Sequence, residues 1–236
     1  MEKKTKMEWE NIEDFRRVYE NNIQFWISKL KDAEIKGSAI FNEDIPETKE
    51  KWEKIKLIIV ADNPGNKEAI EKRYLVGGAG EIARAFFKIT FNDLRINMKE
   101  NVLVLNKTPI NSSNTSDLKN IYNNIKGKGI LNDTQEWMAK TIYKLHQILE
   151  CDLWIIGSGN FEKIFEKFKE TINGAYNESE NEKWKRVFVF KHFSYGWFFR
   201  DFEKYKKNEE NLKNGENLKE YLKKIGTEKR VDIFGW

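Results

Sequence analysis

The sequence has little cysteine, proline or histidine, and it has no long uninterrupted hydrophobic run. Its 236 residues include 1 Cys, 3 Pro and 2 His. The single cysteine, Cys151, excludes an intramolecular disulfide and a metal cluster held by several cysteines of one chain. A transmembrane helix needs about 20 apolar residues in succession, and a signal peptide needs an apolar core near the N-terminus. Because both are missing from the sequence, we expect a soluble, cytoplasmic protein with no membrane partner.

The composition is that of a folded protein. Hydrophobic residues make up 39% of the chain and aromatic residues 14%, which suffices for one sizeable core and argues against disorder. No linker rich in Gly, Pro or Ser divides the chain, so we predict one domain over residues 1–236. The formal net charge of +4 is compatible with a polyanionic partner, although it is weak support for one.

Strand-like runs alternate with segments of helical apolar spacing. The strand-like runs, each followed by a polar loop, are KLIIVAD, ENVLVLNKTP, DLWIIGSGN and KRVFVFKHFSYG. Helices are predicted over residues 9–30, 80–90, 133–150, with Asp133 as the N-cap, and 161–172. This alternation predicts an α/β fold, a three-layer αβα sandwich around a central, mainly parallel four-stranded sheet. Helical extensions are expected at the N-terminus (about 1–50) and the C-terminus (about 198–236).

Ligands of parallel sheets bind beyond the carboxyl ends of the strands. The loops that follow the predicted strands are ADNPG, LNKTPINSS, GSGN and HFSYG. They are polar, and they contain two of the three prolines. We therefore expect these loops to converge into one site.

In this order, the loops resemble motifs of the uracil-DNA glycosylase superfamily, over about residues 55–200. ADNPG is similar to the first motif, KRYLVGGAGEIA to a segment of the thermostable branch, NVLVLN to the second-strand segment of the main branch, and VFKHFSYG to the last motif. The resemblance implies a monofunctional DNA glycosylase that hydrolyses the N-glycosidic bond of uracil or a related deaminated base during base excision repair. Such an enzyme binds DNA, flips the base out of the stack, and needs no metal and no cofactor; we expect a monomer.

The resemblance also implies catalytic roles. Asn63 occupies the position of the residue that positions the attacking water, and Asp62 beside it either polarises that water or only caps the loop. His192 occupies the position of the donor to the oxygen of the leaving base. The other histidine, His146, lies within a predicted helix, and we interpret it as structural or exposed.

Four positions match the base-binding part of the family. Asn106 is the amide that reads the base edge. Gly65 replaces a bulky Tyr that excludes the thymine methyl group in the main branch, so it leaves room for other bases. Leu75 stands where a stacking aromatic is expected, and Tyr74 precedes it as an alternative.

The resemblance assigns one contact with the DNA backbone, and the residues themselves suggest others. Ser194 matches a phosphate contact of the last motif, and Trp197 is a candidate wedge between stacked bases. Ser158 and Gly159 place backbone N–H groups at a predicted helix start, which suits a phosphate. Candidate DNA-facing lysines, which are also typical of a solvated helix face, are Lys204, Lys206, Lys207, Lys223 and Lys224.

Other interpretations stay open at this point. Asn, Pro and Gly are turn formers, and a strand can end in Asn or His without any catalytic role. The chain is alternatively a catalytically weak or inactive glycosylase-fold protein that binds DNA or a nucleobase, because the first motif lacks the Asp of the main branch. A third alternative is an unrelated α/β nucleotide hydrolase or ligand-binding module, but the sequence has no phosphate-binding loop, no dinucleotide fingerprint and no Gly-x-Ser-x-Gly elbow.

Overall fold

The β-branched runs of the sequence form the strands of one parallel sheet. The computed structural model describes residues 9, 11–113, 117–179, 182–196, 198–201, 203 and 218–236. The strands are β1 (Leu57–Ala61), β2 (Val102–Asn106), β3 (Asp152–Ile156) and β4 (Val187–Phe190). Their order in the sheet is β2-β1-β3-β4, and every neighbouring pair is parallel. The predicted α/β class with a four-stranded parallel sheet is confirmed.

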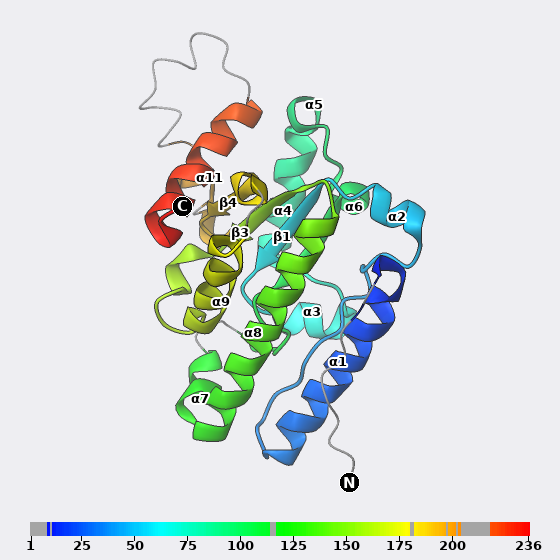
Figure 1. Ribbon diagram of the computed structural model, residues 1–236, viewed down its shortest axis with the longest axis vertical. Coiled ribbons are helices and arrows are strands. Elements are labelled where there is room, and N and C mark those ends of the chain that lie inside the picture. The colour runs from blue at the N-terminus through cyan, green and yellow to red at the C-terminus, as the bar shows by residue number, and fades with distance from the viewer. Residues whose placement is uncertain are drawn as a thin grey trace.

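One face of the sheet is covered by the longer helices. Alternate side chains of a strand point to opposite faces, and Ile58 and Val60 point toward α1 (Ile12–Asp32), α8 (Ile125–Ile148) and α9 (Glu166–Asn177), with which they share a hydrophobic cluster. Figure 1 shows α8 crossing in front of the sheet. Each of these helices buries one apolar stripe, which is how an amphipathic helix contributes to a core.

The opposite face carries a second cluster. Leu57 and Ile59 lie here with Trp154, and they are covered by α4 (Gly78–Ile89) and α11 (Leu218–Phe234). The sheet is therefore buried on both sides, as expected for the middle layer of a sandwich. The short helices are α2 (Lys49–Glu53), α3 (Asn66–Glu71), α5 (Phe91–Leu94), α6 (Met98–Asn101), α7 (Leu118–Asn123), η2 (Ser158–Asn160), η3 (Glu182–Arg186) and η4 (Ser194–Gly196).

Helix α8 begins nine residues earlier than the sequence predicts. Its N-cap is Asn124, whose side chain accepts a hydrogen bond from the Gly127 N–H at 2.9 Å, so the expected cap at Asp133 is wrong. Glycine lowers helix propensity, which hides this first turn from a periodicity argument. Gly127 is required for another reason, because a Cβ there would lie 2.4 Å from the Ile121 carbonyl oxygen.

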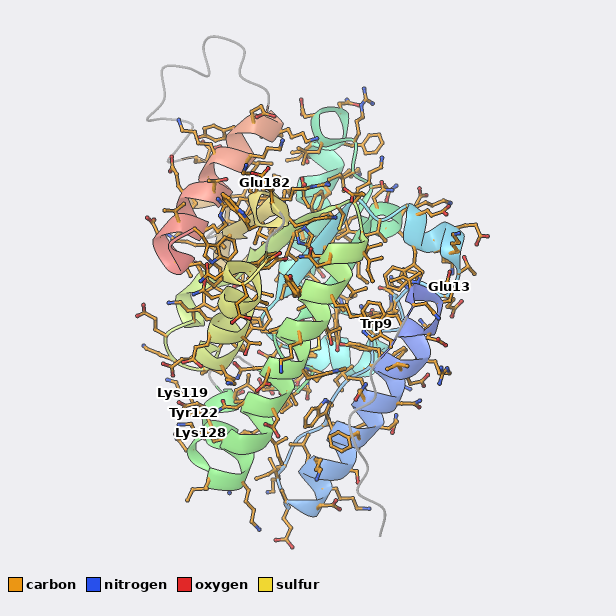
Figure 2. All side chains as sticks on the ribbon, in the orientation of Figure 1. Trp9, Glu13, Lys119, Tyr122, Lys128 and Glu182 are labelled. Atoms are coloured by element: carbon orange, nitrogen blue, oxygen red, sulfur yellow. The ribbon has the colours of Figure 1, made fainter. Side chains whose placement is uncertain are left out.

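The N-terminal helix packs on the core through aromatic rings. Trp9, labelled beside α1 in Figure 2, meets Phe15 edge-on with ring centroids 5.1 Å apart. Tyr19 lies 5.1 Å from Trp137 of α8. These contacts join α1 to the same cluster as the sheet.

The C-terminal extension is described only in part. The predicted helix is confirmed from Leu218 onward, where Lys223 pairs with Glu220 at 3.6 Å along the face of α11. Lys204, Lys206 and Lys207 lie outside the described residues. Among the residues that the structure describes, no helix has both the length and the apolar character needed to cross a bilayer.

His146 is fully buried between α8, α9 and the start of β3. Its Nε2 donates to the Cys151 carbonyl oxygen at 3.1 Å, which leaves Nδ1 to accept from the Tyr176 hydroxyl at 2.5 Å. Burial lowers the pKa of His146 from 6.5 to about 4, against a smaller opposing effect of the Cys151 hydrogen bond. The interpretation of this histidine as structural agrees with its position.

We expect the free energy of unfolding to fall as the pH drops below 6.5. An unfolded His146 takes up a proton there, whereas the folded residue stays neutral down to about pH 4. The stabilisation is complete above the unfolded pKa, and about 2 kcal/mol of it is lost between about pH 7.5 and about pH 5. Urea denaturation across this range measures the effect. His146→Gln should show a shallower pH dependence, because the buried imidazole that stays neutral in the folded state is then absent; equal slopes for variant and parent would contradict the assignment.

Candidate functional site

A cleft of about 1380 Å³ lies at the carboxyl ends of the strands. The loop after each strand contributes to its lining. The predicted site residues among the lining residues are Asp62, Asn63, Gly65, Leu75, Asn106, Ser158, Gly159, His192 and Ser194. The structure thus brings together the loops that the sequence analysis expected to converge.

The floor of the cleft is built on a buried lysine that the sequence analysis missed. Lys107 directly follows Asn106 and is fully buried. Its ammonium group donates to Asp62 Oδ1 and to the carbonyl oxygens of Ile156 and Gly157, at 2.7 and 3.0 Å for the two carbonyls. One side chain therefore ties together the ends of β2, β1 and β3.

Aromatic rings and a glycine complete the surroundings of Lys107. Its Nζ lies 4.7 Å from the centroid of the Phe161 ring and 4.9 Å from that of Phe165, within the range of cation–π attraction. Burial lowers the pKa of Lys107, and the attraction of Asp62 opposes that shift. Gly157 has φ +86°, and a Cβ there would lie 2.3 Å from Asp62 Oδ1, so only glycine fits beside the ion pair.

The ion pair bears on the expected role of Asp62. From the sequence, this carboxylate could polarise a water or only hold the loop. In the structure Asp62 Oδ1 accepts from a buried ammonium, and the Asp62 side chain is 8% exposed. This position matches the structural alternative better than the catalytic one.

Asn106 has a buried side-chain amide, and its nitrogen makes no hydrogen bond to the described residues. It ends β2 beside Ala61 of β1, and it is 2% exposed. Its Nδ2 has no hydrogen-bond partner among the described residues, yet the side chain lines the cleft. A buried donor without a partner costs about 1–3 kcal/mol. A ligand with an acceptor oxygen at this point of the cleft would remove that cost.

His192 is held in one tautomer. Its Nδ1 accepts from the Ser194 backbone N–H at 3.1 Å and lies 2.8 Å from Ser194 Oγ. The neutral ring therefore carries its proton on Nε2. Burial lowers the pKa of His192 below 6.5; Asp62 opposes this, Lys107 reinforces it, and Glu68 opposes it. The cleft thus holds a neutral imidazole that donates through Nε2.

Ser194, expected to contact a phosphate, has its hydroxyl on His192 instead. Ser158 and Gly159 line the cleft, but they form a single turn of 3-10 helix, and α9 begins only at Glu166. The sequence predicts that they start a helix, but in the structure they form only this short turn, and the longer helix begins after them. Trp197, the predicted wedge, lies outside the described residues.

Asn63 is fixed by its amide nitrogen. Nδ2 donates to Ser112 Oγ at 2.9 Å and to the Pro64 carbonyl oxygen at 3.1 Å. Asn111 donates to the same Pro64 carbonyl at 3.0 Å, so the loop after β2 is tied to the loop after β1. The Asn63 side chain is therefore oriented within the cleft wall.

Of the two candidates for stacking on a base, only one faces the cleft. Leu75 lines it, with φ +54°. Tyr74 lies in the core, where its hydroxyl donates to the Ile40 carbonyl oxygen at 2.5 Å and is 3.5 Å from the Tyr19 hydroxyl. Because the Tyr74 side chain is buried in the core and does not line the cleft, Tyr74 does not fit the expected role of stacking on a base.

Glu68 is a second cleft residue that the sequence analysis missed. Its carboxylate accepts from the backbone N–H groups of Gly65, Val76 and Gly77, at 3.1, 3.1 and 3.0 Å. It joins the loop after β1 to the start of α4 and lies in the cleft wall. An acidic residue in the first turn of a helix is a recognisable capping signal, which would have pointed to it.

The cations at the cleft surface are paired. Lys67 lies 3.5 Å from Glu81, and Lys191 lies 2.8 Å from Asp201. The cleft wall is therefore not a strongly basic surface. In the described part of the chain, no group of His, Cys, Asp and Glu side chains is arranged to hold a metal ion.

No protein-family model and no curated protein matches this chain. The chemistry of the cleft is therefore the basis for a functional assignment.

We expect Lys107→Met to destabilise the protein by about 3–5 kcal/mol, because it leaves Asp62 as an uncompensated buried charge. The double variant Lys107→Met with Asp62→Asn removes both charges and should recover a large part of the loss. Urea denaturation of both variants at neutral pH measures the difference. A single variant as stable as the parent would contradict the role given to the ion pair.

We expect ¹⁵N NMR to show His192 as the Nε2–H tautomer, with a titration midpoint below 6.5 because burial disfavours the charged ring. Ser194→Ala keeps the backbone N–H on Nδ1 and should keep the tautomer. An Nδ1–H tautomer, or a midpoint at or above 6.5, would show that the ring is not held in this way.

Proposed function

We propose that the protein is a monofunctional DNA glycosylase that removes uracil or a related deaminated base from DNA, acting in the cytoplasm as a monomer. The observation that carries the proposal is the buried Asn106 amide: its Nδ2 has no partner within the described part of the chain, and Asn106 lines the same cleft as His192, whose proton is on Nε2. Two donors in one cleft suit a ligand with carbonyl oxygens, such as a deaminated base.

The same donors suit the chemistry of N-glycosidic hydrolysis. The bond between C1′ and the base nitrogen breaks with its electron pair leaving on the base, and negative charge develops on the base oxygens. Preorganised N–H groups of His192 and Asn106 stabilise that charge. A water held at the Asn63 wall adds to C1′, and its proton ends on the base nitrogen. The products are an abasic sugar and a neutral base.

The depth of the donors requires a flipped base. Asn106 lies at the buried floor of the cleft, and a base stacked within a duplex cannot reach it. The size of the cleft, about 1380 Å³, leaves room for a base and its sugar. Gly65 in the wall adds no side chain that would bar a purine.

A second candidate is a catalytically weak relative that binds DNA or a nucleobase. It is favoured by the Asp62–Lys107 pair, because that carboxylate is engaged in the floor while Asn63 cannot take up a proton. The pairing of Lys67 and Lys191 with carboxylates favours binding of a base over tight binding of a phosphate backbone.

Cleavage of labelled oligonucleotides containing uracil, hypoxanthine or xanthine tests both candidates, in single-stranded, matched and mismatched forms. We expect abasic sites with the parent, and a rate lower by about 10²- to 10³-fold for Asn106→Ala and for His192→Ala, since each removes a donor to the leaving base. His146→Gln, which changes the other histidine outside the cleft, should cleave like the parent at neutral pH.

The outcomes separate the candidates. If no substrate is cleaved, the glycosylase proposal fails. DNA or base binding that Asn106→Ala abolishes would then support the second candidate, and absence of any binding would reject both.

A further inference from the structure

The carboxylates that line the cleft differ in their partners. Asp62 pairs with Lys107 in the floor, and Glu81 lies 3.5 Å from Lys67 at the rim. Glu68 instead receives its hydrogen bonds from three backbone N–H groups. Within the described residues it is therefore the lining carboxylate whose charge is not matched by a lysine or arginine.

The Glu68 carboxylate is held in a fixed orientation between two glycines. Oε2 accepts from Gly65, and Oε1 accepts from Val76 and Gly77. A Cβ at Gly65 would lie 2.8 Å from Oε2, and one at Gly77 would lie 3.2 Å from Oε1. The two glycines leave the space that the carboxylate occupies, so its position is determined before a ligand arrives.

The charge of Glu68 is only partly offset by its surroundings. It sits at the N-terminus of α4, where a helix carries roughly half a positive charge. Because the carboxylate carries a full negative charge, about half a negative charge is left over. Glu68 also acts on His192, which lines the same cleft: it raises the pKa of this histidine against the larger effect of burial.

The cleft therefore presents a fixed anion together with the N–H donors of His192 and Asn106. We propose that Glu68 stabilises the positive charge that develops on the deoxyribose ring as the N-glycosidic bond breaks. The inference rests on the proposed function, and it assigns to Glu68 the catalytic carboxylate that neither Asp62 nor Asn63 supplies.

Hydrolysis of the N-glycosidic bond requires no proton transfer to or from Glu68. The electron pair of the bond from C1′ to nitrogen leaves with the base, and the positive charge is shared between C1′ and the ring oxygen. The oxygen of a water then adds to C1′, and the proton of that water ends on the base nitrogen. Glu68 acts through its charge alone.

Glu68→Gln separates this role from a structural one. Glutamine retains an acceptor oxygen for the Val76 and Gly77 N–H groups and removes the charge, but it also loses the hydrogen bond from Gly65, because its amide nitrogen cannot accept. Glu81→Gln is the matched control, because it neutralises another cleft-lining carboxylate, one already paired with Lys67.

Two measurements test the proposal. The first is single-turnover cleavage of the best deaminated-base substrate, for which we expect Glu68→Gln to be slower by about 10²-fold and Glu81→Gln to match the parent. The second needs no cleavage: binding, at low salt, of an oligonucleotide with a cationic pyrrolidine in place of one deoxyribose, compared with one carrying a neutral tetrahydrofuran. The parent should prefer the cationic probe by about tenfold or more.

The binding measurement tests the role of the Glu68 charge independently of whether the protein cleaves DNA. If the parent cleaves nothing but prefers the cationic probe, and Glu68→Gln loses only that preference, the role of the Glu68 charge is supported and the glycosylase activity fails. No preference in the parent overturns the inference, whether or not it cleaves. A Glu68→Gln protein that binds both probes more weakly than the parent but keeps the parent's preference for the cationic probe overturns it too, because a purely structural role of Glu68 explains that result.

Discussion

The cleft depends on one buried ammonium group. Removing a charge from water costs several kcal/mol, and the cost is offset only by close partners of suitable geometry. Lys107 finds them in Asp62, in the carbonyls of Ile156 and Gly157, and in two aromatic rings. These partners lie at the end of β3 and in the segments that follow β1 and β3, while Lys107 itself follows β2. The ion pair thus fixes three neighbouring strand ends at once, and it places the preceding residue, Asn106, at the cleft floor.

The chemistry of the cleft follows from this neutral floor. Because Asp62 and Lys107 satisfy each other, the polar groups that the cleft offers to a ligand include the Asn106 amide, the Nε2–H of His192 and the Glu68 carboxylate. Donors and an anion in one cavity match a reaction in which a base gains negative charge while a sugar gains positive charge. The same arrangement would bind a deaminated base without cleaving it if no water is activated at Asn63.

The sheet and the convergence of its loops could be predicted from the sequence, because buried β-branched runs with polar ends have few alternatives. The partners of individual side chains could not. Lys107 looks like an ordinary loop lysine after a strand, and only its burial shows otherwise. Tyr74 was a candidate for the cleft, but the backbone at Leu75 sends it into the core. The first turns of α8 were missed because Gly127 masks them, although close packing against Ile121 requires that glycine.

The most direct test of base binding is an NMR titration of the Asn106 side-chain amide. The signal is assigned by its loss in Asn106→Asp, and free uracil, hypoxanthine and xanthine are added in turn. At saturation by one of these bases, we expect a large shift of the Nδ2 protons, together with a smaller shift of the His192 Nε2–H. Unchanged Asn106 signals at high concentrations of all three bases would contradict the central claim that this amide receives the base.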